Sequence, residues 1–177
     1  MKNKKSKLLA LLSVLPVLMF VSACSAPRTF EKYNYDIRVD SVFKGSSIEV
    51  DLVGVNASEL PRFESMSVTE YWQPGNSIRN STIPPKMRFR FPSNKKIALS
   101  KNDPIWEKWR GRDVKYIIFI ADLPGIMSDR HGSVDSRRLI LPVDWRQWEN
   151  KIEEDGEIVI ELGANGIVSL PSPGTVE

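Results

Sequence analysis

Alternation of apolar and polar residues predicts most of the secondary structure of this chain. The clearest case is SSIEVDLVGVN (46–56), where every second residue from Ile48 to Leu52 is apolar and the residues between are acidic. A period of two over this length is typical of a half-buried β-strand. Three weaker patterns predict further strands: YNYDIRVD (33–40), KMRFRF (86–91) and, as the neighbour of the latter across a turn at 92–94, KKIALS (95–100).

The second half of the chain contains longer apolar runs. VKYIIFIADLPG (114–125) is almost continuously apolar and ends in Pro and Gly, which predicts a central strand buried on both faces. A polar loop (127–136) separates it from another expected strand, RRLILPV (137–143). Near the end, GEIVIELGANGIVSL (156–170) predicts a hairpin around its Asn-Gly pair.

Two short helices are expected. In NDPIWEKWRGR (102–112), Asp103 is the expected N-cap, Pro104 the first helical residue and Gly111 the stop, with two tryptophans on one face. SVTEYW (67–72) predicts a shorter helix that ends before a Pro-Gly-Asn sequence. Many short strands and few helices predict an all-β fold, a two-sheet β-sandwich with one or two short helices, formed by residues 34–177 as a single domain. Strands that follow one another in the sequence are expected to be antiparallel.

The first 23 residues have the layout of a secretory signal. Four lysines precede a mostly apolar stretch, Leu8–Val21, which is short for a membrane span, and small residues follow. Val21-Ser22-Ala23-Cys24 resembles the bacterial lipobox, in which the cysteine is lipidated on sulfur and becomes the new N-terminus. Cys24 is the only cysteine, so it has no disulfide partner within the chain. Cleavage by an ordinary signal peptidase and an uncleaved anchor are the alternatives.

Removal of the signal changes the charge of the protein. The chain has a net charge of +3, and loss of four lysines with no acidic residue brings it to −1. The sequence therefore gives no support for a nucleic-acid partner. Residues 24–33 are expected to form the lipidated tether. Ser25 follows Cys24, whereas an Asp at this position would resemble the inner-membrane retention signal of Gram-negative bacteria. We therefore expect the protein to lie on the periplasmic face of the outer membrane.

Catalytic or metal chemistry has little support in the sequence. The single histidine, His131, lies in a polar loop, and no serine lies in a nucleophile elbow. Asp129 and Asp135 lack the spacing of an EF-hand loop. We therefore predict no catalytic residue, no metal and no cofactor. A carboxylate pair for glycoside hydrolysis stays an open alternative, because two acidic residues at the right distance leave little signal in a sequence.

The tryptophans leave an alternative function open. Trp145 and Trp148 are placed to form a sugar-stacking platform, and Trp72, Trp106 and Trp109 to line a groove, although large aromatic residues more often pack in a core. A carbohydrate-binding or hydrolytic envelope lipoprotein is therefore the rival hypothesis. A carrier of a lipid or other hydrophobic ligand is a third, and it requires an internal cavity.

The order of these elements resembles the TssJ-type outer-membrane lipoproteins of type VI secretion. The resemblance rests on a lipidated cysteine, the early alternating strand, SVTEYW, the core strand KYIIFIAD, RRLILPV and the terminal hairpin. It implies a transthyretin-like sandwich, a non-catalytic role, a lipid on Cys24 and binding to the periplasmic part of an inner-membrane protein, TssM. In that family the loop between the first two strands contacts the partner, which implies a role for Phe43, Lys44 and Gly45, although this loop is short here.

Overall fold

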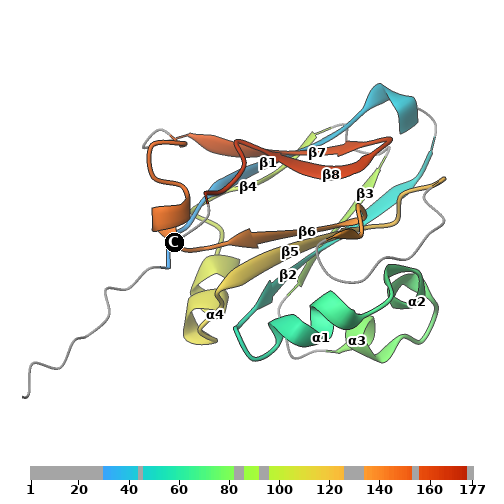
Figure 1. The fold of residues 1–177 in the computed structure, drawn as a ribbon, viewed down its shortest axis with the longest axis horizontal. Coiled ribbons are helices and arrows are strands. Elements are labelled where there is room, and N and C mark those ends of the chain that lie inside the picture. Colours follow the sequence, from blue (N-terminus) through green and yellow to red (C-terminus); the bar gives the residue numbers. More distant parts are fainter. Residues whose placement is uncertain are drawn as a thin grey trace, which may run out of the picture.

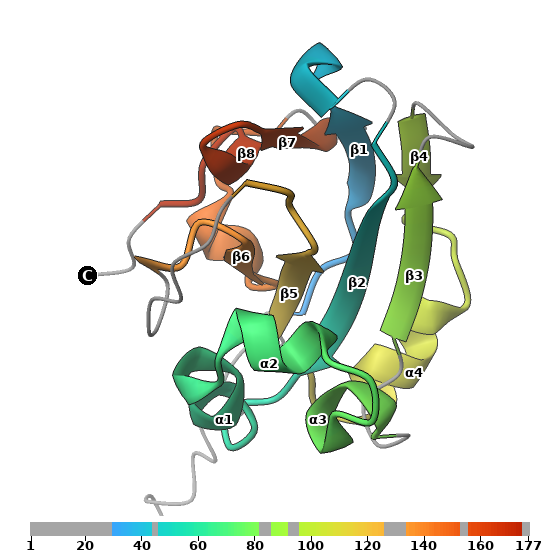
Figure 2. The same ribbon diagram turned by 90° about the vertical axis from the view of Figure 1, so that its right-hand side faces the viewer.

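Two four-stranded sheets face each other across an apolar core (Figures 1 and 2). The computed structural model describes residues 30–43, 46–81, 86–91, 96–125, 134–152 and 156–174. Its strands are β1 (Asn34–Val39), β2 (Ile48–Val55), β3 (Lys86–Phe91), β4 (Lys96–Leu99), β5 (Tyr116–Ala121), β6 (Arg138–Pro142), β7 (Glu157–Gly163) and β8 (Gly166–Leu170). The sheets have the strand orders β4-β1-β7-β8 and β3-β2-β5-β6. The predicted two-sheet β-sandwich is confirmed.

The helices are short and lie outside the sandwich. The structure describes α1 (Leu60–Ser65), α2 (Val68–Trp72), α3 (Ser77–Asn80) and α4 (Ile105–Gly111), with single 3₁₀ turns η1 (Ser41–Phe43) and η3 (Trp145–Gln147). α2 and α4 were expected, whereas α1 and α3 were not. The Ser67 side chain caps α2 by accepting a hydrogen bond from the Glu70 N–H.

Two predictions about strand pairing are wrong. β3 and β4 are not neighbours, because β3 pairs with β2 in one sheet and β4 pairs with β1 in the other. Figure 2 shows them one above the other at the same side of the molecule, so the chain passes from sheet to sheet between them. The strands are also not all antiparallel, since β1 and β7 pair in parallel.

Aromatic side chains fill much of the space between the sheets. Tyr35 of β1 stacks on Trp106 of α4, with ring centroids 6.0 Å apart, and meets the edge of Phe119 of β5 at 5.3 Å. Trp106 also packs perpendicular to Trp109, 5.1 Å away. All four of these residues are fully buried, and α4 therefore closes one end of the core.

A second apolar cluster lies on the outer face of the β2-β5-β6 sheet. Val53 of β2 and Ile118 of β5 pack there against Phe63 of α1 and Tyr71 of α2. The three helices α1–α3 cover this face (Figures 1 and 2). β5 is buried on both faces, as predicted, but β2 was predicted to be half-buried and is buried on both faces too.

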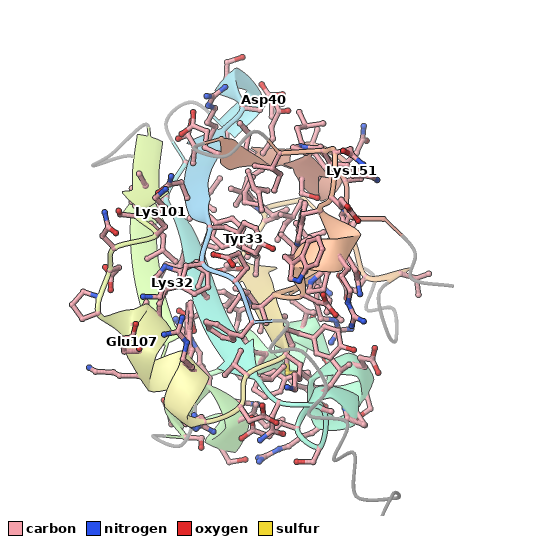
Figure 3. All side chains as sticks on the ribbon, turned by 90° about the vertical axis from the view of Figure 1, so that its left-hand side faces the viewer. Lys32, Tyr33, Asp40, Lys101, Glu107 and Lys151 are labelled. Atoms are coloured by element: carbon pink, nitrogen blue, oxygen red, sulfur yellow. The ribbon has the colours of Figure 1, made fainter. Side chains whose placement is uncertain are left out.

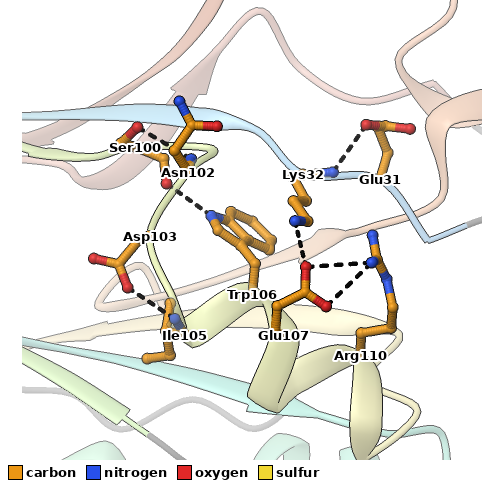
Figure 4. Close-up of polar contacts among 9 residues, drawn as sticks. All are labelled: Glu31, Lys32, Ser100, Asn102, Asp103, Ile105, Trp106, Glu107 and Arg110. Carbon is orange, nitrogen blue, oxygen red and sulfur yellow. Dashed lines mark hydrogen bonds and ion pairs between the residues drawn. The ribbon is translucent and has the colours of Figure 1, made fainter.

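Local signals placed α4 and the last hairpin to within one residue. α4 begins at Ile105 with Pro104 as its N-cap, one residue later than the predicted start at Pro104 with Asp103 as the cap. The Asp103 carboxylate still accepts a hydrogen bond from the Ile105 N–H at 2.8 Å (Figure 4). Gly111 is its last residue, as expected. In the hairpin, Gly163 pairs with Gly166, which has a φ of +124°.

The sandwich has two distinct ends. Phe30 forms a β-bridge with Asp144, and the chain then runs into β1 beside α4 and η3; we call this the entry end (Figure 1). The η1 turn, the end of β5, the start of β6 and the β7–β8 turn lie at the other end, the loop end (Figure 1). Within the range 24–33 that was expected to form the tether, Phe30 and Tyr33 pack against the core.

Candidate functional site

The residues predicted to bind a partner fall at the loop end. Phe43 is 8% exposed and belongs to the core, so its ring is not part of the surface. Its neighbour Val42 is 58% exposed and is the apolar side chain that η1 presents to solvent. Lys44, Gly45 and the predicted lipidation site, Cys24, lie outside the described residues.

Hydrogen bonds to Asp40 hold η1 in place. The Asp40 carboxylate accepts hydrogen bonds from the Val42 N–H at 3.0 Å and from the Ser41 hydroxyl at 3.1 Å. The Asp40 N–H donates to the carbonyl of Leu162 at 2.9 Å, which ties the turn to β7. With Phe43 buried below it, Val42 projects from a fixed turn.

The other connections at the loop end are linked to each other. The Ile167 N–H at the start of β8 donates to the Ser136 carbonyl at 2.8 Å, and a Cβ on Gly166 would lie 2.3 Å from that same oxygen. A second exposed apolar residue, Val134, precedes Ser136 and is 64% exposed. His131 lies outside the described residues.

No cluster typical of a metal site emerges in the part of the chain that the structure describes. Within those residues, no three His, Cys, Asp or Glu side chains gather in a way that would hold an ion. The helices described there are also too short or too polar to cross a membrane.

The tryptophans differ sharply in exposure. Trp106 and Trp109 are fully buried in the core, and Trp72 packs against the edge of Tyr71 beneath the helices. Trp148 is 3% exposed, and its Nε1 donates a hydrogen bond to the Pro142 carbonyl at 3.0 Å. Trp145 remains 43% exposed, so the two-tryptophan platform considered from the sequence is absent and a single indole faces solvent.

Ion pairs at the entry end fasten α4 to the start of β1. The Lys32 ammonium donates to the Glu107 carboxylate at 2.5 Å, and the Arg110 guanidinium donates to both oxygens of that carboxylate (Figure 4). The hydrogen bond from Lys32, followed by the charge of Arg110, holds the pKa of Glu107 below its usual value. Trp106 adds a hydrogen bond from its Nε1 to the Ser100 carbonyl at 2.9 Å.

Buried charges attach the helical layer to the sheet. Asp51 of β2 is fully buried and accepts hydrogen bonds from the Tyr71 hydroxyl at 2.8 Å and from Arg79 Nε at 3.2 Å. Arg79 also donates to Glu49 at 2.7 Å, and its guanidinium lies 4.0 Å from the centre of the Trp72 ring. The sequence around Asp51 gives no signal for this contact, because its partner Arg79 lies 28 residues further along the chain.

A comparable contact involves β6. Arg138 is 2% exposed, and its guanidinium donates to the carbonyls of Phe63 and Met66 at the end of α1. It thereby satisfies carbonyl groups that the helix leaves without an intrahelical partner. The preceding residue, Arg137, pairs with buried Asp135 at 2.9 Å. These arginines therefore serve the fold.

Solved structures with the same fold come from type VI secretion. No family model matches the sequence, and a search of curated proteins gives no match. The C-terminal domain of the type VI secretion protein TssM from EAEC is 16% identical, with a TM-score of 0.51, over 78% of this chain and 100% of that one. A type VI membrane complex is 15% identical, also with a TM-score of 0.51, over 80% of this chain and 99% of that one.

A third structure is less similar. Serratia marcescens Lip, a membrane-bound component of the type VI secretion system, is 13% identical with a TM-score of 0.47, over 78% of this chain and 96% of that one. The first two structures show that this chain has a β-sandwich fold found in the type VI secretion envelope. The resemblance drawn from the sequence is confirmed at the level of the fold.

Proposed function

We propose that this chain is a non-catalytic, lipid-anchored adaptor on the periplasmic face of the outer membrane, and an envelope component of a type VI secretion apparatus. In this proposal residues 1–23 are a signal peptide and Cys24 carries the acyl chains. The loop end binds the periplasmic domain of an inner-membrane secretion protein similar to TssM. The fold shared with type VI envelope structures supports the secretion role.

One observation supports the adaptor role above the others: the chain enters the sandwich at the end opposite its exposed β1–β2 turn (Figure 1). Phe30 follows Cys24 by six residues, which span at most about 20 Å when extended. A lipid on Cys24 would therefore hold the entry end close to the membrane. The six residues of β1 then carry η1 about 20 Å further away, where a partner reaches it.

The surface offered at that end suits a protein partner. Val42 is apolar, exposed and fixed by Asp40, so binding would lose little side-chain freedom on ordering. Buried Phe43 supports the turn from below. Lys44 and Gly45 follow directly in sequence and complete the proposed contact surface.

Site-specific cross-linking tests this proposal. A photoactivatable amino acid replaces Val42 in the full-length chain, and cells also produce the periplasmic domain of the TssM-like protein encoded in the same genome. We expect a cross-linked product from position 42, and no such product from Trp145, an exposed residue at the entry end. Equal products from both positions, or none from position 42, would contradict a loop-end interface.

A charge substitution gives an independent measure. Val42→Asp places a carboxylate in an apolar contact, and we expect the affinity for the same partner domain to fall about tenfold or more. Trp145→Ala is the matched control and should leave that affinity unchanged. An affinity that Val42→Asp leaves intact would count against the proposed surface.

A further inference from the structure

A cleft at the entry end is separate from the proposed partner surface. Its volume is about 310 Å³, at the lower end of the range usual for small-molecule sites. Its walls are formed by the residues that lead into β1, by Lys101 after β4, and by η3 with the residues that follow it. Figure 3 looks onto this end and shows Lys32, Tyr33 and Lys101 near one another.

The exposed indole of Trp145 stands on a rigid support in this cleft. The Asp144 carboxylate caps η3 by accepting a hydrogen bond from the Arg146 N–H at 3.0 Å, and it also pairs with the Arg146 guanidinium. That pairing lowers the pKa of Asp144 below its usual value, so the cap stays ionised at neutral pH. Buried Trp148 anchors the other side of the turn. The position of Trp145 is therefore set before any ligand arrives.

Polar groups in the same cleft have unused hydrogen-bonding capacity. Among the described residues, the buried Tyr33 hydroxyl has no hydrogen-bond partner. The Glu149 carboxylate belongs to an exposed residue of the lining, where a ligand can reach it. Asn34 accepts a hydrogen bond from the Lys101 N–H at 2.8 Å through its side-chain oxygen, which leaves its amide N–H groups as donors. The cleft thus offers both donors and acceptors beside an aromatic ring.

The charges of the lining residues balance. Glu31 and Glu149 are negative, and Lys32 and Lys101 are positive, so the lining has no net charge. An anionic ligand such as a phosphate would meet two carboxylates, and a cationic ligand would meet two ammonium groups. An uncharged ligand with one apolar face and several hydroxyls fits this lining best. A sugar ring has this chemistry, because its C–H face stacks on an indole and its hydroxyls bond to carboxylates and amides.

We infer that the entry-end cleft binds a neutral saccharide of one or two rings, stacked on Trp145. The hydroxyls of the sugar then bond to Glu149 and the Asn34 amide. This function is independent of the adaptor role, since the η3 turn, which contains Trp145, and the η1 turn, which contains Val42, lie at opposite ends of the sandwich (Figure 1). The carbohydrate-binding hypothesis drawn from the sequence assumed stacking on Trp145 and Trp148. In this proposal only Trp145 stacks on the sugar.

Titration of the full-length protein with two disaccharides tests the inference. The protein is held in a detergent without a sugar headgroup, and tryptophan fluorescence is followed as N,N′-diacetylchitobiose or cellobiose is added. We expect a saturable shift with at least one of them. If only the first binds, the cleft also reads the acetamido group, which points to a cell-wall glycan; cellobiose binding alone points to sugars without that group.

Matched variants, measured by isothermal titration calorimetry because Trp145 is itself the fluorescent reporter, then locate the site. Trp145→Ala should weaken binding about tenfold or more, Trp145→Phe should restore most of the loss, and Glu149→Gln should weaken binding by a smaller factor. Val42→Ala at the loop end is the control and should bind like the wild type. The inference is overturned if neither disaccharide binds, or if Trp145→Ala and Glu149→Gln both bind as tightly as the wild type while melting at the same temperature.

Discussion

At the scale of single residues, one glycine sets how closely α4 approaches the sheet. A Cβ on Gly54 of β2 would lie 2.5 Å from both Cδ1 and Nε1 of Trp109, well inside van der Waals contact. Trp109 is fully buried, and side chains in a close-packed protein interior have little room to shift. The absent side chain at position 54 therefore permits the indole to lie against the strand backbone.

We predict that Gly54→Ala destabilises the fold by about 1–3 kcal/mol through overpacking. Urea denaturation measures the change. Gly111→Ala is the matched control, because a Cβ there meets nothing within 4 Å and alanine favours the helix. A Gly54→Ala protein as stable as Gly111→Ala would show that Trp109 relaxes freely.

Tyr35 gives a prediction about alkaline pH. Its side chain is fully buried, and its hydroxyl has no hydrogen-bond partner among the described residues. Burial, followed by the proximity of Tyr33, raises the pKa of Tyr35 above the ordinary value of 10.0. The unfolded chain then loses this proton first, so the free energy of unfolding falls as the pH rises past about 10.

Tyr35→Phe removes both the titrating hydroxyl and its unpaired buried oxygen. We expect the variant to lose less stability above pH 10 than the wild type, and to gain about 1 kcal/mol at neutral pH because an unpaired buried hydroxyl is gone. Thermal unfolding between pH 7 and pH 11 checks this. An unchanged alkaline slope together with lower stability at pH 7 would mean that the hydroxyl has a favourable partner.

At the scale of elements, the helical layer depends on charges buried against the sheet. We predict that Arg79→Met destabilises the protein by about 3 kcal/mol, because it removes an ion pair from fully buried Asp51 and the cation–π contact with Trp72. Arg62→Met, at an exposed position on α1, should change stability by less than about 0.5 kcal/mol. Chemical denaturation that finds the two variants equal would contradict this account.

Local sequence patterns predicted individual elements well. The alternation of β2, the apolar run of β5 and the Asn-Gly pair of the β7–β8 hairpin depend on neighbours within a few residues, and each was found in the structure. The pairing of β3 and β4 was wrong, because periodicity states which face is buried and not which strand lies alongside. The burial of the outer face of β2 also required α1 and α2, which follow this strand in the chain, and only α2 had a clear sequence signal.

The candidate sites were predictable to different degrees. The lipobox around Cys24 is a contiguous motif, and the partner-binding role of the segment between β1 and β2 was implied by the resemblance to TssJ-type lipoproteins; both stay predictions. The sequence predicted only part of the cleft. It placed Trp145 and Trp148 together, three residues apart, but Trp145 is exposed and Trp148 is buried. The η3 turn decides which of the two is exposed. Glu149 follows Trp148 directly, whereas Asn34 and Lys101 of the same cleft come from other segments of the chain.

At the scale of the whole molecule, the sandwich separates two surfaces along its length (Figure 1). The entry end carries the cleft, and the loop end carries Val42. An anchor at Cys24 would give this arrangement a fixed direction relative to the membrane. A single acyl chain holds a protein only marginally, at about 10⁴ M⁻¹, whereas two or more make attachment stable. The proposed adaptor role therefore requires that the lipid group on Cys24 carry two or more acyl chains.

Lipidation of Cys24 is the most direct test of the central claim. Cells producing the full-length chain are grown with labelled palmitate, beside cells producing Cys24→Ser, and membranes are separated by sedimentation. We predict that the wild type incorporates label and sediments with the outer membrane, while the variant carries no label and does not appear there as the mature lipoprotein. An unlabelled wild type, or an equally labelled variant in the same membrane fraction, would contradict the account.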